Sequence, residues 1–198
     1  MSLRHTTRLS TLSASIGLAF LVAASAACAQ GTSTTSAAGM KASSGASLAA
    51  GDKTFVQKAA VGGLAEVEMG KLAQQKGSSD QVKQFGSRMV EDHSKANDEL
   101  KQIASSKGMT LPTDLDAKHK SKMDKMQKLS GAQFDRAYMD DMVADHKEDV
   151  ADFKKQASSG KDSDLKAFAA KTLPTLQDHL KMAQSTDAAV KGTKSASR

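Results

Sequence analysis

The sequence predicts an all-α protein, a four-helix bundle with a long crossover between the second and third helices. Apolar residues recur every three or four positions in four long segments, which is the spacing of one buried helix face. β-branched residues are sparse and do not alternate over a useful length, so no strand is expected. About 25 residues separate the second segment from the third, enough to run the height of a bundle.

The N-terminal residues 1–29 have the pattern of an export signal. Arg4 and Arg8 precede a short apolar run, which small residues follow. Cleavage after Ala29 is the favoured processing, and lipidation of Cys28 is the weaker alternative. We therefore expect an exported protein, periplasmic or associated with the outer membrane, with no transmembrane helix in its mature form.

Composition divides the rest of the chain into three parts. Residues 30–51 are mostly Ser, Gly, Thr and Ala and predict a flexible linker, residues 52–186 the helical domain, and residues 187–198 a disordered polar tail. The formal net charge is +6, but lysine and aspartate alternate along the helices, so no nucleic-acid partner is expected. An envelope partner or a homo-oligomer is left open.

The first two helices are expected to form a hairpin. The first spans residues 52–76 and ends at Gly77; the second runs from Ser78 or Ser79 to about Ser106. Because the loop between them is only a few residues long, these helices should pack antiparallel.

The third and fourth helices look like a divergent copy of that hairpin. The third covers residues 134–157 and ends before Gly160, and the fourth covers residues 163–185. Pro174 interrupts the hydrogen bonding of the fourth helix, so a kink or a freed carbonyl is expected there.

One polar residue falls on the apolar face of each helix. His146, for example, lies four residues after Met142 and four before Val150, in line with side chains that must face a core. The four polar residues are Glu66, His93, His146 and His179. Buried imidazoles and carboxylates need partners, so we expect these four to converge at one height in the core.

Several motifs resemble the bacterial family called domain of unknown function 4142, over about residues 52–183. They are Phe55 with Glu66, Met89-Val-Glu-Asp-His93, Phe134-Asp-Arg-Ala-Tyr138 with His146, and Leu173-Pro174-Thr-Leu-Gln-Asp-His179. Members of that family are exported, often described as outer membrane proteins, and assigned a ferritin-like four-helix fold. The resemblance implies that fold and no established activity.

The sequence lacks the carboxylates of a ferritin-like di-iron site. That site takes a Glu-x-x-His pair from each of two helices. The residues three before the histidines are Val90, Val143 and Leu176. No Gly-rich phosphate loop and no nucleophile motif was found in the sequence either. We therefore do not expect a di-iron oxidase, and the pattern favours a protein that is not an enzyme.

Two interpretations of the four polar residues stay open. One carboxylate and three imidazoles form a sensible ligand set for zinc, copper, iron or manganese. The alternative is a metal-free polar layer that fixes helix register in a structural or stress-related interaction module.

Each of these residues also has a methionine one turn away on its own helix. These candidate additional ligands are Met69, Met89, Met142 and Met182. Thioethers beside imidazoles suit Cu(I), which makes copper the preferred metal hypothesis. The competing interpretation is that these methionines only fill gaps in the core.

Overall fold

The structure is a computed structural model, and it describes residues 47–192. These residues form helices and no strand, which confirms the all-α prediction. The helices are α1 (Ala50–Lys76), α2 (Asp80–Ser106), α3 (Ala117–Gln127), α4 (Gly131–Ser159) and α5 (Ser163–Gly192). The expected signal sequence and most of the expected linker lie outside the described residues.

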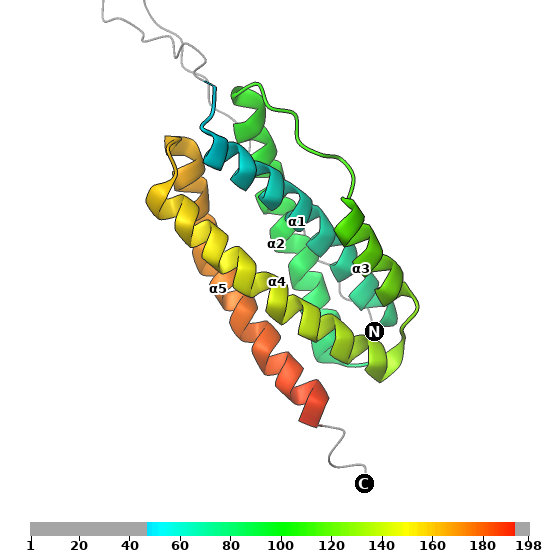
Figure 1. Cartoon of the computed structure of the whole chain (residues 1–198). Helices are drawn as coiled ribbons and strands as arrows, with labels where there is room; N and C mark the ends of the chain where they lie inside the picture. The colour runs from blue at the N-terminus through cyan, green and yellow to red at the C-terminus, as the bar shows by residue number, and fades with distance from the viewer. Residues whose placement is uncertain (1–46, 193–198) are drawn as a thin grey trace, which may run out of the picture. The chain divides into compact units, whose positions relative to one another are not determined.

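The four long helices form two hairpins, in which α1 packs mainly on α2 and α4 mainly on α5 (Figure 1). Phe55, near the start of α1, meets Phe153, near the end of α4, with ring centroids 5.0 Å apart. At the other end of α1, Lys76 donates a hydrogen bond to the carbonyl of Gln127, 2.6 Å away. Helices α1 and α4 are therefore antiparallel, and α2 and α4 run in the same direction. The segment between α2 and α4, which contains α3, crosses over as expected.

Two buried aspartates tie the hairpins together reciprocally. Asp52, in the first turn of α1, accepts backbone N–H bonds from Lys161 and Asp162 in the α4–α5 turn, at 3.1 and 2.9 Å. Asp135, near the start of α4, accepts a backbone N–H bond from Ser78 in the α1–α2 turn, at 3.0 Å. The first helix of each hairpin thus caps the turn of the other.

Glycine allows α1 and α2 to touch through their backbones. A Cβ atom added to Gly70 would lie 2.6 Å from the carbonyl oxygen of Gly86, and one added to Gly86 would lie 2.7 Å from that of Gly70. Side chains cannot fit between helices at this separation, so the α1–α2 seam is closed at this level.

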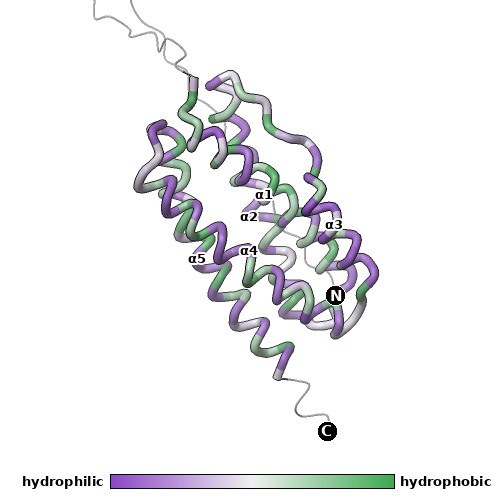
Figure 2. Tube along the Cα trace, viewed as in Figure 1, coloured by the Kyte–Doolittle hydropathy of each residue, from purple (hydrophilic) through white to green (hydrophobic). Residues whose placement is uncertain are grey.

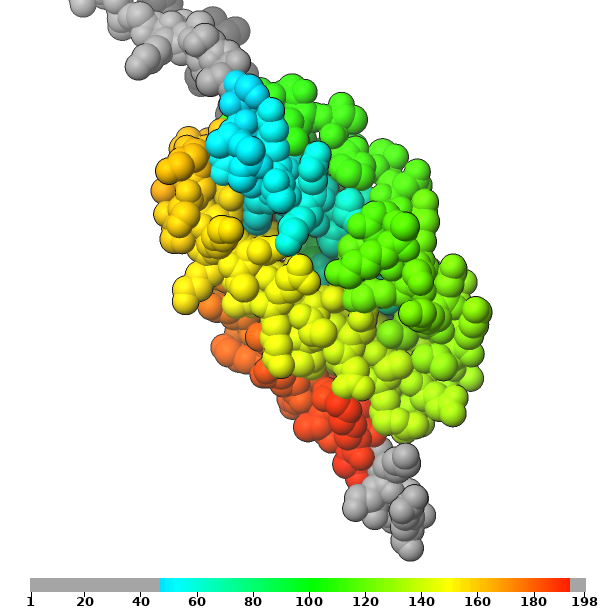
Figure 3. All heavy atoms as spheres, in the orientation of Figure 1, coloured from blue at the N-terminus to red at the C-terminus, as the bar shows by residue number. Residues whose placement is uncertain are grey.

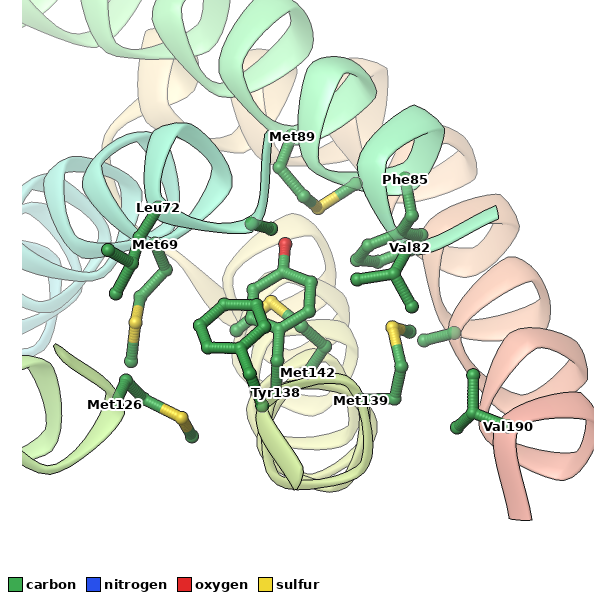
Figure 4. Close-up of a cluster of buried hydrophobic side chains, with 13 residues drawn as sticks. Met69, Leu72, Val82, Phe85, Met89, Met126, Tyr138, Met139, Met142 and Val190 are labelled. Atoms are coloured by element: carbon green, nitrogen blue, oxygen red, sulfur yellow. The ribbon is translucent and has the colours of Figure 1, made fainter. Parts of the chain in front are cut away.

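Purple and green alternate along every helix in Figure 2, as amphipathic helices require. The buried apolar residues form two clusters. The methionine cluster comprises Met69, Leu72, Ala73, Val82, Phe85, Met89, Met126, Phe134, Tyr138, Met139, Met142, Ala183 and Val190 (Figure 4). The phenylalanine cluster comprises Phe55, Val56, Ala60, Leu100, Ala104, Phe153, Leu165, Phe168, Ala169 and Leu176. On all four long helices, the predicted polar residue lies between the parts that enter these clusters.

The helical region extends further than predicted at both ends. Helix α1 begins at Ala50, inside the expected linker, and α5 continues past residue 186 to Gly192. The last turn of α5 is held because Val190 is buried in the methionine cluster and Lys191 pairs with Asp140, at 2.5 Å. Pro174 lies inside α5, which is continuous through it. Within residues 47–192, no helix combines the length and apolarity needed to cross a membrane.

Candidate metal centre

Each long helix contributes one of the four predicted polar side chains to a layer between the two apolar clusters. Glu66 from α1, His93 from α2, His146 from α4 and His179 from α5 are 4, 6, 0 and 1% exposed. The three imidazole centroids are 5.3–5.7 Å apart in every pairing. The four residues therefore lie together in the core, as the sequence predicted.

The rings of His93 and His146 are each oriented by a hydrogen bond of their own. Nδ1 of His93 lies 2.8 Å from Oε2 of Glu66, and Nδ1 of His146 lies 3.0 Å from the carbonyl oxygen of Met142. A carbonyl only accepts, so Nδ1 of His146 carries the proton and its Nε2 presents a lone pair.

His179 is oriented by a carboxylate from the neighbouring helix α2. Its Nε2 lies 2.9 Å from Oδ2 of Asp92, which also pairs with Arg88 one turn earlier. Burial alone would raise the pKa of Asp92, but the bonds from His179 and Arg88 outweigh it and lower that pKa. Asp92 therefore acts as the anionic acceptor that sets the tautomer of His179.

The remaining nitrogens of the three rings have no hydrogen-bond partner, although Nε2 of His146 lies 3.5 Å from Oε1 of Glu66. Among the described residues, the buried polar atoms without a hydrogen bond include Nε2 of His93, Nε2 of His146 and Nδ1 of His179. Each ring places one nitrogen within 4.8 Å of the nitrogens of the other two. Leaving such an atom unsatisfied costs about 1–3 kcal/mol, so three converging ones need an explanation.

Burial keeps these imidazoles neutral. It lowers the pKa of His93 and of His179 to about 4, and it also lowers the pKa of His146. At neutral pH all three rings are therefore in the deprotonated form that can coordinate a metal ion.

Asp149 belongs to the site but was missed from the sequence. It lies three residues after His146 on the same face of α4, and with Glu66 and His146 it forms a second group of potential ligands. Burial, and then the neighbouring Glu66, raise the pKa of Asp149 well above its usual range. The residues three before the histidines are apolar, but the residue three after His146 is a carboxylate on the same helix face, and this spacing is the sequence signal for Asp149.

The methionine predictions are partly corrected. Met69, Met89 and Met142 are buried in the methionine cluster, so their thioethers lie on one side of the polar layer. Met182 is 41% exposed and does not belong to the core. One turn after His179, the buried residue is Ala183, four positions on, and not Met182, three positions on.

The fold and the layer define a class of protein: an all-helical protein with a buried cluster of three histidines and carboxylates. The model of a family described as a domain of unknown function, DUF4142, matches residues 37–186. The chain belongs to this family, as its motifs indicated. No match was found among curated proteins.

Two solved structures share the fold. A DUF305 fragment from Deinococcus radiodurans has a TM-score of 0.63 at 10% identity, covering 72% of this chain and 99% of its own. A DUF305 protein from Streptomyces coelicolor, described as secreted, has a TM-score of 0.61 at 14% identity, covering 71% of this chain and 94% of its own. At these identities the likeness concerns the fold alone.

Proposed function

We propose that this protein binds one transition-metal ion through His93, His146 and His179, with Glu66 as the fourth ligand. The observation that carries the proposal is a buried layer in which three histidine rings meet, each with one ring nitrogen that has no hydrogen bond. A second observation supports it. The other nitrogen of every ring is held by a carboxylate or a carbonyl, the arrangement that orients metal-binding histidines in proteins.

The donor set favours some ions over others. Neutral imidazoles suit zinc, copper and iron, whereas manganese prefers carboxylate and water oxygens. Three nitrogens and one carboxylate would complete a tetrahedral zinc site. Copper, the ion preferred from the sequence, remains a candidate because imidazoles bind it as well, and three methionines line one side of the layer.

A metal-free structural role is the second candidate. The bonds His93–Glu66 and His179–Asp92 each join two helices without any ion, and they would fix helix register on their own. In either case we propose an exported protein of the cell envelope, on the basis of the signal-like residues 1–29.

Metal analysis separates the two candidates. The purified protein is dialysed against Zn²⁺ or against Cu²⁺ with a reductant, and bound metal is measured for wild type, His93→Ala, His146→Ala and the control His119→Ala. His119 lies on α3 outside the layer, in the wall of a pocket between α1, α3 and α4, and Asp116 holds its Nδ1 at 2.7 Å, so the control removes an imidazole that is not a proposed ligand. We expect one tightly bound ion in wild type and His119→Ala and its loss in the other two. Equal binding by His146→Ala, or none by wild type, would reject the metal proposal.

A further inference from the structure

A buried metal layer needs an entrance, and most directions are closed. The methionine and phenylalanine clusters cover the layer along the bundle axis. The α1–α2 seam is closed by the backbone contact of Gly70 with Gly86. A small cavity that touches Glu66 and His93 has a volume of only about 20 Å³, room for about one water molecule and too little for a hydrated ion.

The open direction is a pocket of about 360 Å³ on the α1–α4 seam, beneath α3. Figure 3 shows this face, where the surfaces of α1, α3 and α4 meet around a hollow. Glu66 and Asp149 line this pocket and also belong to the polar layer. Oε1 of Glu66 is buried and has no hydrogen-bond partner. This side chain therefore connects the pocket to the site.

The charge of the pocket favours a cation. Two of the carboxyls that line it, Glu66 and Asp149, have a pKa that burial raises, so they add negative charge only when they are deprotonated. In all, seven lining side chains carry a carboxyl group, against three lysines. One of those lysines, Lys122 from α3, already bridges Asp141 and Asp145 with both distances at 2.7 Å. These two aspartates therefore hold a positive group at the place where an entering ion would pass. A pocket with an excess of carboxylates over lysines attracts cations and raises their association rate.

We propose that this acidic pocket is the entry site through which the metal cation reaches the histidine layer, with Glu66 as the group that transfers it. The proposal rests on the metal-binding function above. The cation first meets the carboxylates beneath α3, where it competes with the ammonium of Lys122, and then moves to Oε1 of Glu66. From there the unpartnered histidine nitrogens complete its coordination.

The rate of Zn²⁺ uptake tests the route. Gln57 is exposed and lines the pocket, so Gln57→Lys and Gln57→Glu change the charge at the entrance without touching a ligand. Gln102→Lys makes the same change on the exposed surface of α2, outside the pocket. Stopped-flow mixing of each variant with Zn²⁺ and a chromophoric chelator gives the association rate, and equilibrium competition gives the affinity.

We expect Gln57→Lys to slow uptake about threefold and Gln57→Glu to speed it by a similar factor, with both effects shrinking at high salt. Gln102→Lys should match wild type, and His146→Ala should retain no tight binding. If wild type binds Zn²⁺ and both lysine variants behave alike, the route is wrong while the metal site stands. If wild type binds no Zn²⁺ at the layer, the metal site fails and the route with it.

Discussion

Nδ1 of His93 and Oε2 of Glu66 lie 2.8 Å apart, and this pair joins α2 to α1 inside the core. Both side chains are less than a tenth exposed, so neither can exchange its partner for bulk water. A buried polar group that loses its partner pays its full desolvation cost, whereas a replacement that preserves the hydrogen bond costs little.

This relationship predicts different effects for two substitutions of Glu66. In the presence of a chelator, Glu66→Ala should lower the free energy of unfolding by about 1–3 kcal/mol, because it orphans Nδ1 of His93. Glu66→Gln keeps an acceptor oxygen of the same shape and should cost less. Urea denaturation measures both. Glu68→Ala, which removes only an exposed pair with Lys71, is the control; a loss as large as that of Glu66→Ala would contradict the argument.

The lowered histidine pKa values predict the pH dependence of the metal-free protein. In the unfolded chain these imidazoles take up protons near pH 6.5, whereas in the folded protein His93 and His179 do so only at about pH 4. The unfolded state thus binds more protons in this window. Stability should fall as the pH drops from about 6.5 towards 4, by at most about 1.4 kcal/mol per pH unit for each histidine.

The buried carboxyls act in the opposite direction. Burial raises the pKa of Glu66 and of Asp149, so the folded protein holds protons that the unfolded chain has released. Their contribution to stability is lost as the pH rises through their folded pKa values. Asp149→Asn removes one of the carboxyls that oppose the effect of the histidines. This variant should therefore lose stability more steeply than wild type as the pH falls from 6.5 to 4. A flat or inverted profile in thermal melts of this variant would show that the histidines are not buried in their neutral form.

The helical periodicity was sufficient to predict the fold and the convergence of the layer. A residue such as His146, in line with Met142 and Val150, can only point into the core, and four such residues in a bundle must meet if their heights agree. The crossover was predictable because the connector is long enough to span the bundle.

The remaining features of the site depend on contacts between helices, which the apolar periodicity of a single helix cannot predict. Asp92 lies beside His93 in the sequence, yet its carboxylate pairs with His179 on another helix. Lys122 reaches Asp141 and Asp145 only because α3 docks on the α1–α4 seam. The rotation of α5 about its axis decides whether Met182 or Ala183 faces the core one turn after His179. The sequence pattern allowed either.

The contact between Gly70 and Gly86 predicts opposite effects for two Gly→Ala substitutions in α1. Gly70→Ala places a methyl group 2.6 Å from a backbone oxygen, so the helices must separate, at a cost of about 1–3 kcal/mol. Gly62→Ala meets nothing within 4 Å and should stabilise the protein by about 0.5–1 kcal/mol through helix propensity. Urea midpoints compare the two variants. A neutral Gly70→Ala would mean that α1 and α2 are not in backbone contact.

The methionines beside the layer should contribute packing rather than coordination. Met89 and Met142 are almost fully buried among Phe85 and Tyr138, and three ring nitrogens with Oε1 of Glu66 already supply four donors. Met89→Leu combined with Met142→Leu conserves volume, so each change should cost less than about 1.5 kcal/mol.

Cu(I) competition against a chelator tests this prediction, with the exposed Met182→Leu as the control. We expect wild type, the double variant and the control to bind Cu(I) equally, because a ligand set that contains no thioether loses nothing when sulfur becomes carbon. A tenfold weaker affinity in the double variant alone, equivalent to about 1.4 kcal/mol, would instead identify a thioether as a copper ligand. That result would favour a site built for Cu(I), since a thioether selects this soft ion over zinc.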